Sequence, residues 1–592
     1  MATEQQAGRS DLDQMHSNIA RIEALTARLN AALAQRRAID PALQGPGPEI
    51  YRKAAETFVA QMMADPSMLL QSQAQMFSAT LKQMAQLQQA ALEGTAPSDP
   101  GPSDRRFAAE IWQNNPWFNF VKQQYLLGSE AVQAMVASLQ GLTDREKKKL
   151  SFYSQQMVDA LAPTNFLATN PEALQKAMET NGASLVEGME NLVADLERNR
   201  GDLLVTLADR DAFDVGGNLA TTPGKVVYRN RLFELIQYTP QTETVHEIPL
   251  VIFPPWINKF YILDLKPQNS MIRWLVGQGY TLFVVSWVNP DASYADVGMD
   301  HYLREGFLEA LRVAGEICKV PQVNAVGYCI AGTTLALTLA WAKQEGLAPV
   351  ANATFFTTLT DFSDQGEVGV FLDDDFVDGL EREATSSGIL DSFYMSRTFS
   401  YLRSNDLIYQ PAVRNYLMGE KPPAFDLLFW NGDGTNLPGR MAVEYLRGLC
   451  QADQFARGGF PVAGRMVSIR DVEVPLFAVA CESDHIAAWR ASFNGIVEMG
   501  ARDKTFVLAG SGHIAGIVNP PSRVKYAHWW GGDLELDPEG WKASAQSAPG
   551  SWWPLWDEWL SARSGKQVKA RKPAARGKYK ALCDAPGTYV LR

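Results

Sequence analysis

A strand–turn–helix segment near the middle of the chain constrains the fold more than any other feature. It reads NAVGYCIAGTTLALTLAWA over residues 324–342, an apolar run followed by a short turn and good helix formers. Gly327 and Ala331 stand two residues before and two residues after Cys329. Small residues there allow a turn tight enough to lift the central side chain above a sheet, although a glycine is usual where Ala331 stands. The segment therefore predicts a nucleophile elbow with Cys329 at its tip.

Two downstream residues fit the partners that such an elbow requires. The match around Cys329 alone would equally describe a buried thiol, because free cysteine is among the most buried residue types. Asp484 ends the apolar run VPLFAVACESD and His513 follows KTFVLAGSG, so nucleophile, acid and histidine occur in the chain order of α/β-hydrolases. The carboxyl ends of parallel strands meet at one edge of a sheet. We therefore predict an α/β-hydrolase fold with a catalytic triad of Cys329, Asp484 and His513.

The other candidate nucleophiles and bases lack this context. His485 directly follows Asp484, and because successive side chains usually point apart, we expect a lid or structural contact for it. Structural roles are also expected for His246, His301, His528, Cys318, Cys450, Cys481 and Cys583.

An oxyanion hole needs two backbone donors close to the nucleophile. The N–H group of Ile330, directly after Cys329, is the first candidate, and the second should come from the loop after an earlier strand. That loop reads PPWINKFYILDL after the apolar run LVIF, with Ile257 or Asn258 as the donor. A plain structural turn is the alternative for this loop.

The chain divides into two regions that differ in composition and in hydrophobic pattern. Residues 1–200 are rich in Ala, Gln and Met at helical spacing, which predicts an all-helical N-terminal domain. From about residue 225, β-rich runs alternate with helical ones, the pattern of a parallel sheet with crossover helices. One early run, over residues 226–238, reads as a single strand. Residues 361–472 interrupt the alternation and predict a lid inserted into a catalytic domain of residues 225–592.

One helix of the N-terminal domain carries an apolar stripe. Leu70, Phe77, Met84 and Ala91 are spaced by seven residues and share one helix face. A core seam of the domain is the favoured interpretation, because Gln88 interrupts the stripe; a surface for another subunit or an apolar body is the alternative. We expect the domain to support subunit pairing or attachment to an apolar body, and residues 225–592 to fold without it.

Composition excludes several classes of protein. The 592 residues are 46% hydrophobic and carry a net charge of -12, which argues against binding nucleic acid through the overall field. The start, MATEQQAGRS, lacks the basic and apolar regions expected of a signal peptide, and the strongest apolar run, residues 280–288, is too short to span a bilayer. Five scattered cysteines without CxxC pairs, and no HExxH, predict neither disulfides nor a metal site. We expect a soluble cytosolic protein.

Several segments together resemble one enzyme family, over residues 104 to the end. They read DRRFAAEIWQNNPWFNFVKQQYLL, FPPWINKFYILDLKPQNS, GYCIAGT, LLFWNGDGTNLPG, ESDHIAAW, GSGHIAG, GSWWPLWDEWL and DAPGTYV. The chain thereby resembles polyhydroxyalkanoate synthases, in the class that has a single subunit type and prefers short 3-hydroxyacyl-CoA thioesters. The resemblance implies that Cys329, His513 and Asp484 polymerise (R)-3-hydroxyacyl groups, mainly 3-hydroxybutyryl, with release of CoA.

The resemblance also implies partners and leaves one role open. It suggests a homodimer on the surface of cytoplasmic polymer granules, in contact with the growing polyester and with granule-associated proteins. No cofactor is expected, because the CoA thioester is the substrate. Asp484 would assist the 3-hydroxyl group either directly or through His513. The eight basic residues over 563–580, without an acid, read as a solvated stretch, with CoA or granule contact as the alternative.

Two other functions suit the same residues. A thioesterase or an intracellular polyester depolymerase would use the same triad with water as acceptor. A degenerate hydrolase fold could also serve as a non-enzymatic granule scaffold. The cysteine nucleophile favours polymerisation, because a thioester intermediate stays reactive towards an alcohol whereas an acyl-serine is a more stable oxygen ester.

Overall fold

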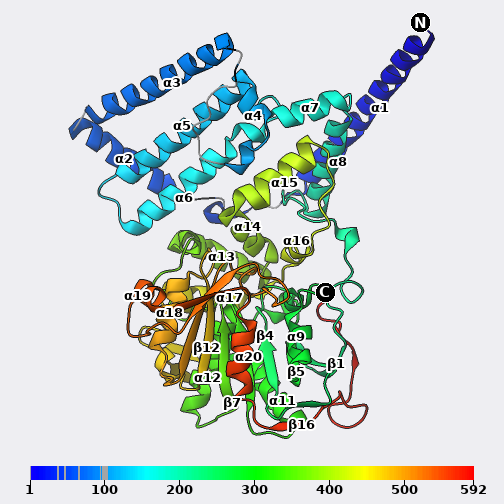
Figure 1. Ribbon diagram of the computed structural model, residues 1–592, viewed down its shortest axis with the longest axis vertical. Coiled ribbons are helices and arrows are strands. Elements are labelled where there is room, and N and C mark those ends of the chain that lie inside the picture. The colour runs from blue at the N-terminus through cyan, green and yellow to red at the C-terminus, as the bar shows by residue number, and fades with distance from the viewer. Residues whose placement is uncertain are drawn as a thin grey trace. The chain divides into compact units, whose positions relative to one another are not determined.

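The chain forms two compact units. The computed structural model describes residues 2–36, 39–43, 45, 48–64, 67–93, 95 and 104–592. One unit comprises Met1–Asp209 with Phe399–Pro423, and the other comprises Arg210–Thr398 with Ala424–Arg592 (Figure 1). The observed boundary at residue 209 lies between the predicted end of the helical domain at residue 200 and the predicted start of the catalytic domain at residue 225. Part of the predicted lid, however, belongs to the first unit.

The first unit is helical, as the sequence predicted. Polar caps and prolines begin its helices where these signals stand in the sequence. The Asn115 side chain caps α5 with Pro116 at the first position, and Thr143 and Glu146 form a reciprocal capping box on α6. The main helices are α1 (Ala2–Leu33), α2 (Pro48–Ala64), α3 (Ser67–Glu93), α5 (Pro116–Ser138), α6 (Asp144–Ala160), α7 (Pro171–Glu179) and α8 (Ala183–Arg198).

The apolar stripe of α3 does not form a core seam. Phe77 is 66% exposed and Met84 49% exposed, while the side chains of Leu70 and Ala91 lie outside the described residues. The contact with α5 is made instead by the neighbouring face, where the buried Gln83 accepts a hydrogen bond from Gln124 (2.6 Å). Periodicity located the stripe but could not tell which face of the helix is covered.

Residues 399–423 pack on α8 within the first unit (Figure 1). Tyr416 Oη donates to Asp195 Oδ2 (2.7 Å), and Asn191 Nδ2 donates to the carbonyl of Asn415 (2.9 Å). A Cβ atom on Gly188 would lie 2.0 Å from the Tyr416 carbonyl oxygen, so only glycine permits this approach. In a fragment of residues 225–592 this segment would lose its packing partners on α8, and the independent folding of that fragment stays a prediction.

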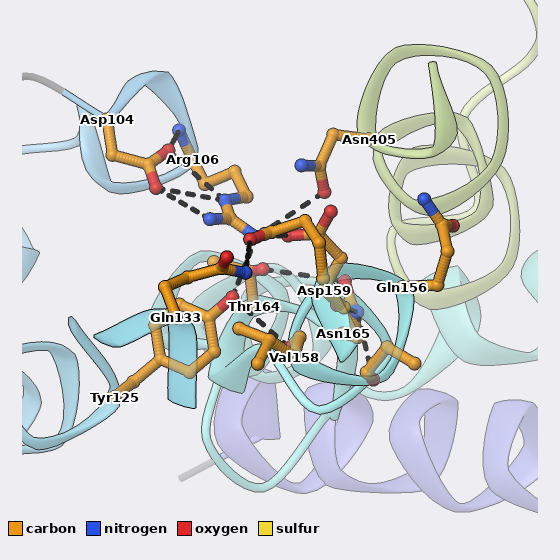
Figure 2. A network of polar contacts seen from close by, with 12 residues as sticks. Asp104, Arg106, Tyr125, Gln133, Gln156, Val158, Asp159, Thr164, Asn165 and Asn405 are labelled. Atoms are coloured by element: carbon orange, nitrogen blue, oxygen red, sulfur yellow. Dashed lines mark hydrogen bonds and ion pairs between the residues drawn. The ribbon is translucent and has the colours of Figure 1, made fainter. Parts of the chain in front are cut away.

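A buried arginine provides the second anchor of this segment (Figure 2). The side chain of Arg106 is 12% exposed and forms ion pairs with Asp104 (2.7 Å) and Asp159 (3.0 Å). It also donates to Tyr125 Oη (2.9 Å) and to Asn405 Oδ1 (3.4 Å). Arg106 thus links α5 and α6 to η9 (Asn405–Tyr409), because its planar guanidinium offers several donors at once.

The second unit is built on an eleven-stranded sheet (Figure 1). Its order is β15-β14-β13-β12-β7-β6-β4-β5-β2-β1-β17, and the strands from β13 to β5 are parallel. The strands are β1 (Gly224–Arg229), β2 (Phe233–Tyr238), β4 (Leu250–Phe253), β5 (Leu282–Trp287), β6 (Val323–Tyr328), β7 (Val350–Phe356), β12 (Leu476–Cys481), β13 (Lys504–Ala509), β14 (Ala527–Trp530), β15 (Gln546–Pro549) and β17 (Cys583–Asp584).

Helices cross between the parallel strands, and the strands are buried on both faces, which explains their continuous apolar sequence. The crossover helices include α9 (Met271–Gly277), α11 (Glu309–Cys318), α12 (Ile330–Gln344) and α18 (Trp489–Glu498). The C-terminal α20 (Trp553–Ser561) contributes Trp556, whose Nε1 donates to Thr354 Oγ1 (3.0 Å). This is the α/β-hydrolase fold that the sequence predicted.

One predicted strand is in fact a hairpin. Residues 226–238 form β1 and β2, which pair antiparallel at the edge of the sheet. The turn between them is formed by Asn230, whose Oδ1 accepts from the N–H groups of Leu232 (2.8 Å) and Phe233 (3.0 Å). Such a side-chain turn is one that asparagine favours.

The remaining lid residues connect β7 to β12, and the beginning of the lid (residues 361–472) contacts Asp453 in its later part. The N–H group of Phe362 donates to Asp453 Oδ1 (2.8 Å), and both Asp361 and Asp453 are buried. Lid elements of this unit include α13 (Asp374–Ser387), α16 (Asp426–Asn431), α17 (Gly439–Glu444) and η11 (Tyr445–Gln451).

This junction makes stability depend on pH. Burial and the neighbouring Asp361 carboxyl raise the pKa of Asp453 to about 6, although Phe362 N–H and Arg457 act in the opposite direction. The folded chain therefore binds this proton more tightly than the unfolded chain, and stability is lost as pH rises through about 6. We expect Asp453→Asn, which keeps the acceptor for Phe362, to raise the free energy of unfolding by about 2 kcal/mol at pH 7.5 and about half as much at pH 5.

Urea unfolding of the wild type and the variant at both pH values measures this difference. Asp374→Asn is the control, because that side chain is 91% exposed and its replacement should change the free energy by less than about 0.5 kcal/mol. A stabilisation of the same size at both pH values, or a loss of stability at pH 7.5, would contradict the prediction.

Candidate active site

Cys329 lies at the turn between β6 and α12. Its backbone has φ 54° and ψ -127°, a strained conformation for a residue with a side chain. A Cβ atom on Gly327 would lie 2.5 Å from Gly332 Cα, and one on Gly332 would lie 1.9 Å from Thr358 Oγ1. The closest approach therefore occurs at Gly332, which explains why Ala331 is tolerated where a glycine is usual.

Asp484 and His513 meet at the carboxyl ends of β12 and β13. Asp484 Oδ2 lies 2.6 Å from His513 Nδ1, and its other oxygen accepts from the N–H groups of Ile486 (2.8 Å) and Ala487 (2.9 Å). The Asp484 side chain is 0% exposed and that of His513 is 10% exposed. Three hydrogen bonds therefore hold the carboxylate in one orientation against the imidazole.

The Cys329 thiol completes this constellation. Its interaction with the His513 side chain favours the charged form of the imidazole, and Cys329 is half-buried. Burial opposes a charge on His513, but the Asp484 carboxylate and Cys329 outweigh it and raise the pKa of His513 well above its ordinary value. This environment favours a protonated imidazole on His513, and a neighbouring cation of this kind assists a cysteine nucleophile.

Tyr328 is a positioning residue that the sequence did not indicate. Its hydroxyl donates to the carbonyl of His513 (3.2 Å), and its ring stacks on the imidazole with centroids 5.9 Å apart. The only signal in the sequence is an aromatic residue directly before the elbow cysteine.

The predicted oxyanion residues lie next to the elbow. Ile330 is the first residue of α12, and the first N–H groups of a helix have no acceptor within it. The loop with Ile257 and Asn258 follows β4, which pairs with β6. Trp256 Nε1 in this loop donates to Thr334 Oγ1 of α12 (3.2 Å), so the loop and the elbow helix are in contact.

The other histidines and cysteines lie where structural roles suit them. The ring of His246 stacks on Tyr280 (4.8 Å), His301 Nδ1 faces the N–H of Gly298 (3.1 Å) and His528 Nδ1 faces the Gly550 carbonyl (3.0 Å). Cys481 is buried within β12, before Asp484. Cys318 and Cys450 are buried, and Cys583 is half-buried.

The run of basic residues over 563–580 lies at the amino-end edge of the parallel strands, opposite to the edge that carries Cys329. Within it, β16 (Gln567–Lys569) pairs with β3 (Thr244–His246), which precedes the amino end of β4. Lys578 pairs with Glu316 (2.7 Å) and Arg563 with Asp503 (2.8 Å). This position and these acidic partners favour the solvated-stretch interpretation over contact with a CoA bound near Cys329.

Neither metal clusters nor spanning helices occur in the part of the chain that the structure describes. Among those residues, no group of three or more His, Cys, Asp or Glu side chains could hold a metal ion. No helix among them is long and apolar enough to cross a membrane.

The fold and this site define an α/β-hydrolase-fold protein with a cysteine at its elbow. Residues 103–275 match the family model described as "Poly-beta-hydroxybutyrate polymerase (PhaC) N-terminus". The "Poly(3-hydroxyalkanoate) polymerase subunit PhaC" of Rhizobium meliloti is 42% identical over 89% of this chain and 86% of its own. The protein of the same name from Cupriavidus necator is 40% identical over 86% and 87%. The chain belongs to the poly(3-hydroxyalkanoate) polymerase family.

A similarity to solved structures is more distant. The Paleococcus ferrophilus monoacylglycerol lipase matches 55% of this chain and 99% of its own, at 12% identity and a TM-score of 0.30.

Proposed function

We propose that the chain polymerises (R)-3-hydroxyacyl groups from their CoA thioesters into a polyester and releases CoA, with 3-hydroxybutyryl-CoA as its main substrate. The observation that carries the proposal is the Cys329 thiol beside His513 at the elbow, in a chain that belongs to this polymerase family.

Acylation follows from this arrangement. His513 accepts the Cys329 proton, the thiolate attacks the thioester carbonyl, and the oxyanion is bound by the N–H of Ile330 and one N–H from Ile257 or Asn258. Collapse of the tetrahedral intermediate breaks the bond to the CoA sulfur, which takes the proton from His513. The product is an acyl-cysteine of similar energy to the starting thioester.

Elongation requires a base for the 3-hydroxyl group of the incoming unit or the chain end. Once CoA has left, His513 is neutral and can take the hydroxyl proton while the oxygen attacks the acyl-cysteine. The bond from the acyl carbon to the Cys329 sulfur then breaks, and the sulfur takes the proton back from His513. Asp484 Oδ2 already faces His513 Nδ1 and its other oxygen is held by two N–H groups. This supports a role for Asp484 through His513 and not directly on the hydroxyl.

We further propose that the helical unit supports dimerisation and attachment to cytoplasmic polymer granules, with granule-associated proteins as possible neighbours. The exposed apolar side chains of α3, Phe77, Leu81 and Met84, support this role, because exposed apolar patches commonly mark interaction surfaces.

Incubation with 3-hydroxybutyryl-CoA, with simultaneous measurement of thiol release and turbidity, tests the proposed function. We expect CoA release to be accompanied by high-mass polyester, and 3-hydroxyoctanoyl-CoA to react more slowly. Release of CoA with an equal amount of free 3-hydroxybutyrate, and no polymer, would instead assign the chain to the thioesterases. No reaction with either thioester would favour a scaffold.

A further inference from the structure

The loop of residues 254–261, named the oxyanion loop below, is held by the sheet on one side. Trp287 Nε1 at the end of β5 donates to the Pro254 carbonyl (2.8 Å), and Trp256 Nε1 donates to Thr334 of α12. Trp256 is 1% exposed and Thr334 is 0% exposed. These two bonds fix the beginning of the loop relative to β5 and the elbow helix.

A lid segment holds the other side of this loop. Residues 430–436, the lid loop, contribute Thr435 N–H, which donates to the Ile257 carbonyl (3.0 Å), and Trp430 Nε1, which donates to the Lys259 carbonyl (2.7 Å). Asn258 and Gly434 form an antiparallel bridge between them. In the bonds from Thr435 and Trp430 the lid loop supplies the donor, and the oxyanion loop supplies a carbonyl oxygen.

Because the Ile257 carbonyl accepts a hydrogen bond from the lid loop, the direction of the Asn258 N–H group is also determined. The carbonyl of Ile257 and the N–H of Asn258 belong to one planar trans peptide, so they point in opposite directions. The bond from Thr435 therefore directs Asn258 N–H away from the lid loop and leaves it available to another acceptor. Of the two predicted donors, the geometry favours Asn258.

A polar cluster of the buried Tyr261 and the half-buried Asp433 ties the lid loop to the oxyanion loop. Tyr261, which is 0% exposed, donates from its hydroxyl to Asp433 Oδ2 (2.8 Å), and Asp433 N–H donates to the Trp430 carbonyl (3.0 Å). Lys259 is 3% exposed and its ammonium donates to the carbonyl of Arg592. A carboxylate in such surroundings requires its hydrogen-bond donors, so Tyr261 and Asp433 hold each other in place.

We propose that Tyr261 and Asp433 are positioning residues for acylation: through the lid loop they orient the Asn258 N–H towards the oxyanion formed at Cys329. The inference rests on the proposed acyl transfer. Removing a whole oxyanion donor costs about 10²–10³ in rate, and loosening one should cost less, about tenfold. The lid would then contribute to catalysis without contacting the reacting atoms.

The test compares two reactions of the same thiol in the full-length protein. Acylation by 3-hydroxybutyryl-CoA, followed as single-turnover CoA release, forms an oxyanion; alkylation by iodoacetamide displaces iodide and forms none. For Tyr261→Phe and Asp433→Asn we expect acylation about tenfold slower, with kcat lowered and KM little changed, and alkylation within about twofold of the wild type.

Tyr280→Phe is the matched control. Tyr280 is also buried and its hydroxyl also donates to a carboxylate, Asp557 Oδ1 (2.8 Å), but it precedes β5 at the other edge of the sheet. Both reactions of this variant should match the wild type. Wild-type acylation in both test variants, or an equal decrease of acylation and alkylation, would overturn the inference. If one test variant fails to fold, the other decides.

Failure of the proposed function gives a different result. A wild-type protein that releases CoA without forming polymer would refute polymerisation, and the ratio of acylation to alkylation would still test the role of Tyr261 and Asp433.

Discussion

In Cys329→Ala we expect the rates of CoA release and polymer formation to fall by more than about a thousandfold while the protein stays folded. The substitution removes the nucleophilic sulfur and keeps the Cβ atom. The backbone at φ 54° is therefore no more strained than in the wild type, and the half-buried site loses little packing.

Thiol release and turbidity measure the effect, and circular dichroism with thermal unfolding checks the fold. Cys583→Ala serves as the control, because this half-buried cysteine lies on the edge strand β17. It should keep wild-type activity. Polymer formation by folded Cys329→Ala at a rate near that of the wild type would refute the assignment of the nucleophile.

His513→Gln and Asp484→Asn are expected to differ from each other. His513→Gln removes the base for both steps and should block acylation. Asp484→Asn leaves the imidazole but removes the carboxylate 2.6 Å from its Nδ1, so His513 becomes a weaker base. A thiol ionises near neutral pH whereas an alcohol does not, and elongation should therefore suffer more than acylation.

Single-turnover CoA release reports acylation in these variants, and the chain length of the polymer reports elongation. We expect Asp484→Asn to release CoA in the first turnover and to form short products slowly. An equal loss of both steps would show that Asp484 only orients the imidazole.

The elbow and its partners could be predicted because their signals are local. A turn after a buried strand needs small residues around Cys329, and Asp484 and His513 follow apolar runs that had to be strands. Once those strands are parallel neighbours, their carboxyl ends meet at one edge, so chain order alone indicated which side chains would lie together.

Other features depend on contacts between residues far apart in the chain, and only the tertiary structure decided them. The apolar stripe of α3 was visible by its period, but Gln83 on the neighbouring face makes the contact with α5. Residues 399–423 read as part of the lid, yet Asp195 and Asn191 of α8 hold them.

The oxyanion loop shows the same division. Its place after β4 could be predicted, whereas the choice of Asn258 over Ile257 as donor rests on the bond from Thr435. Local sequence determines turns, caps and strand ends because these depend on the conformational preferences of a few consecutive residues. Which surfaces pack together depends on the complementarity of segments separated by long stretches of chain, and no local pattern encodes it.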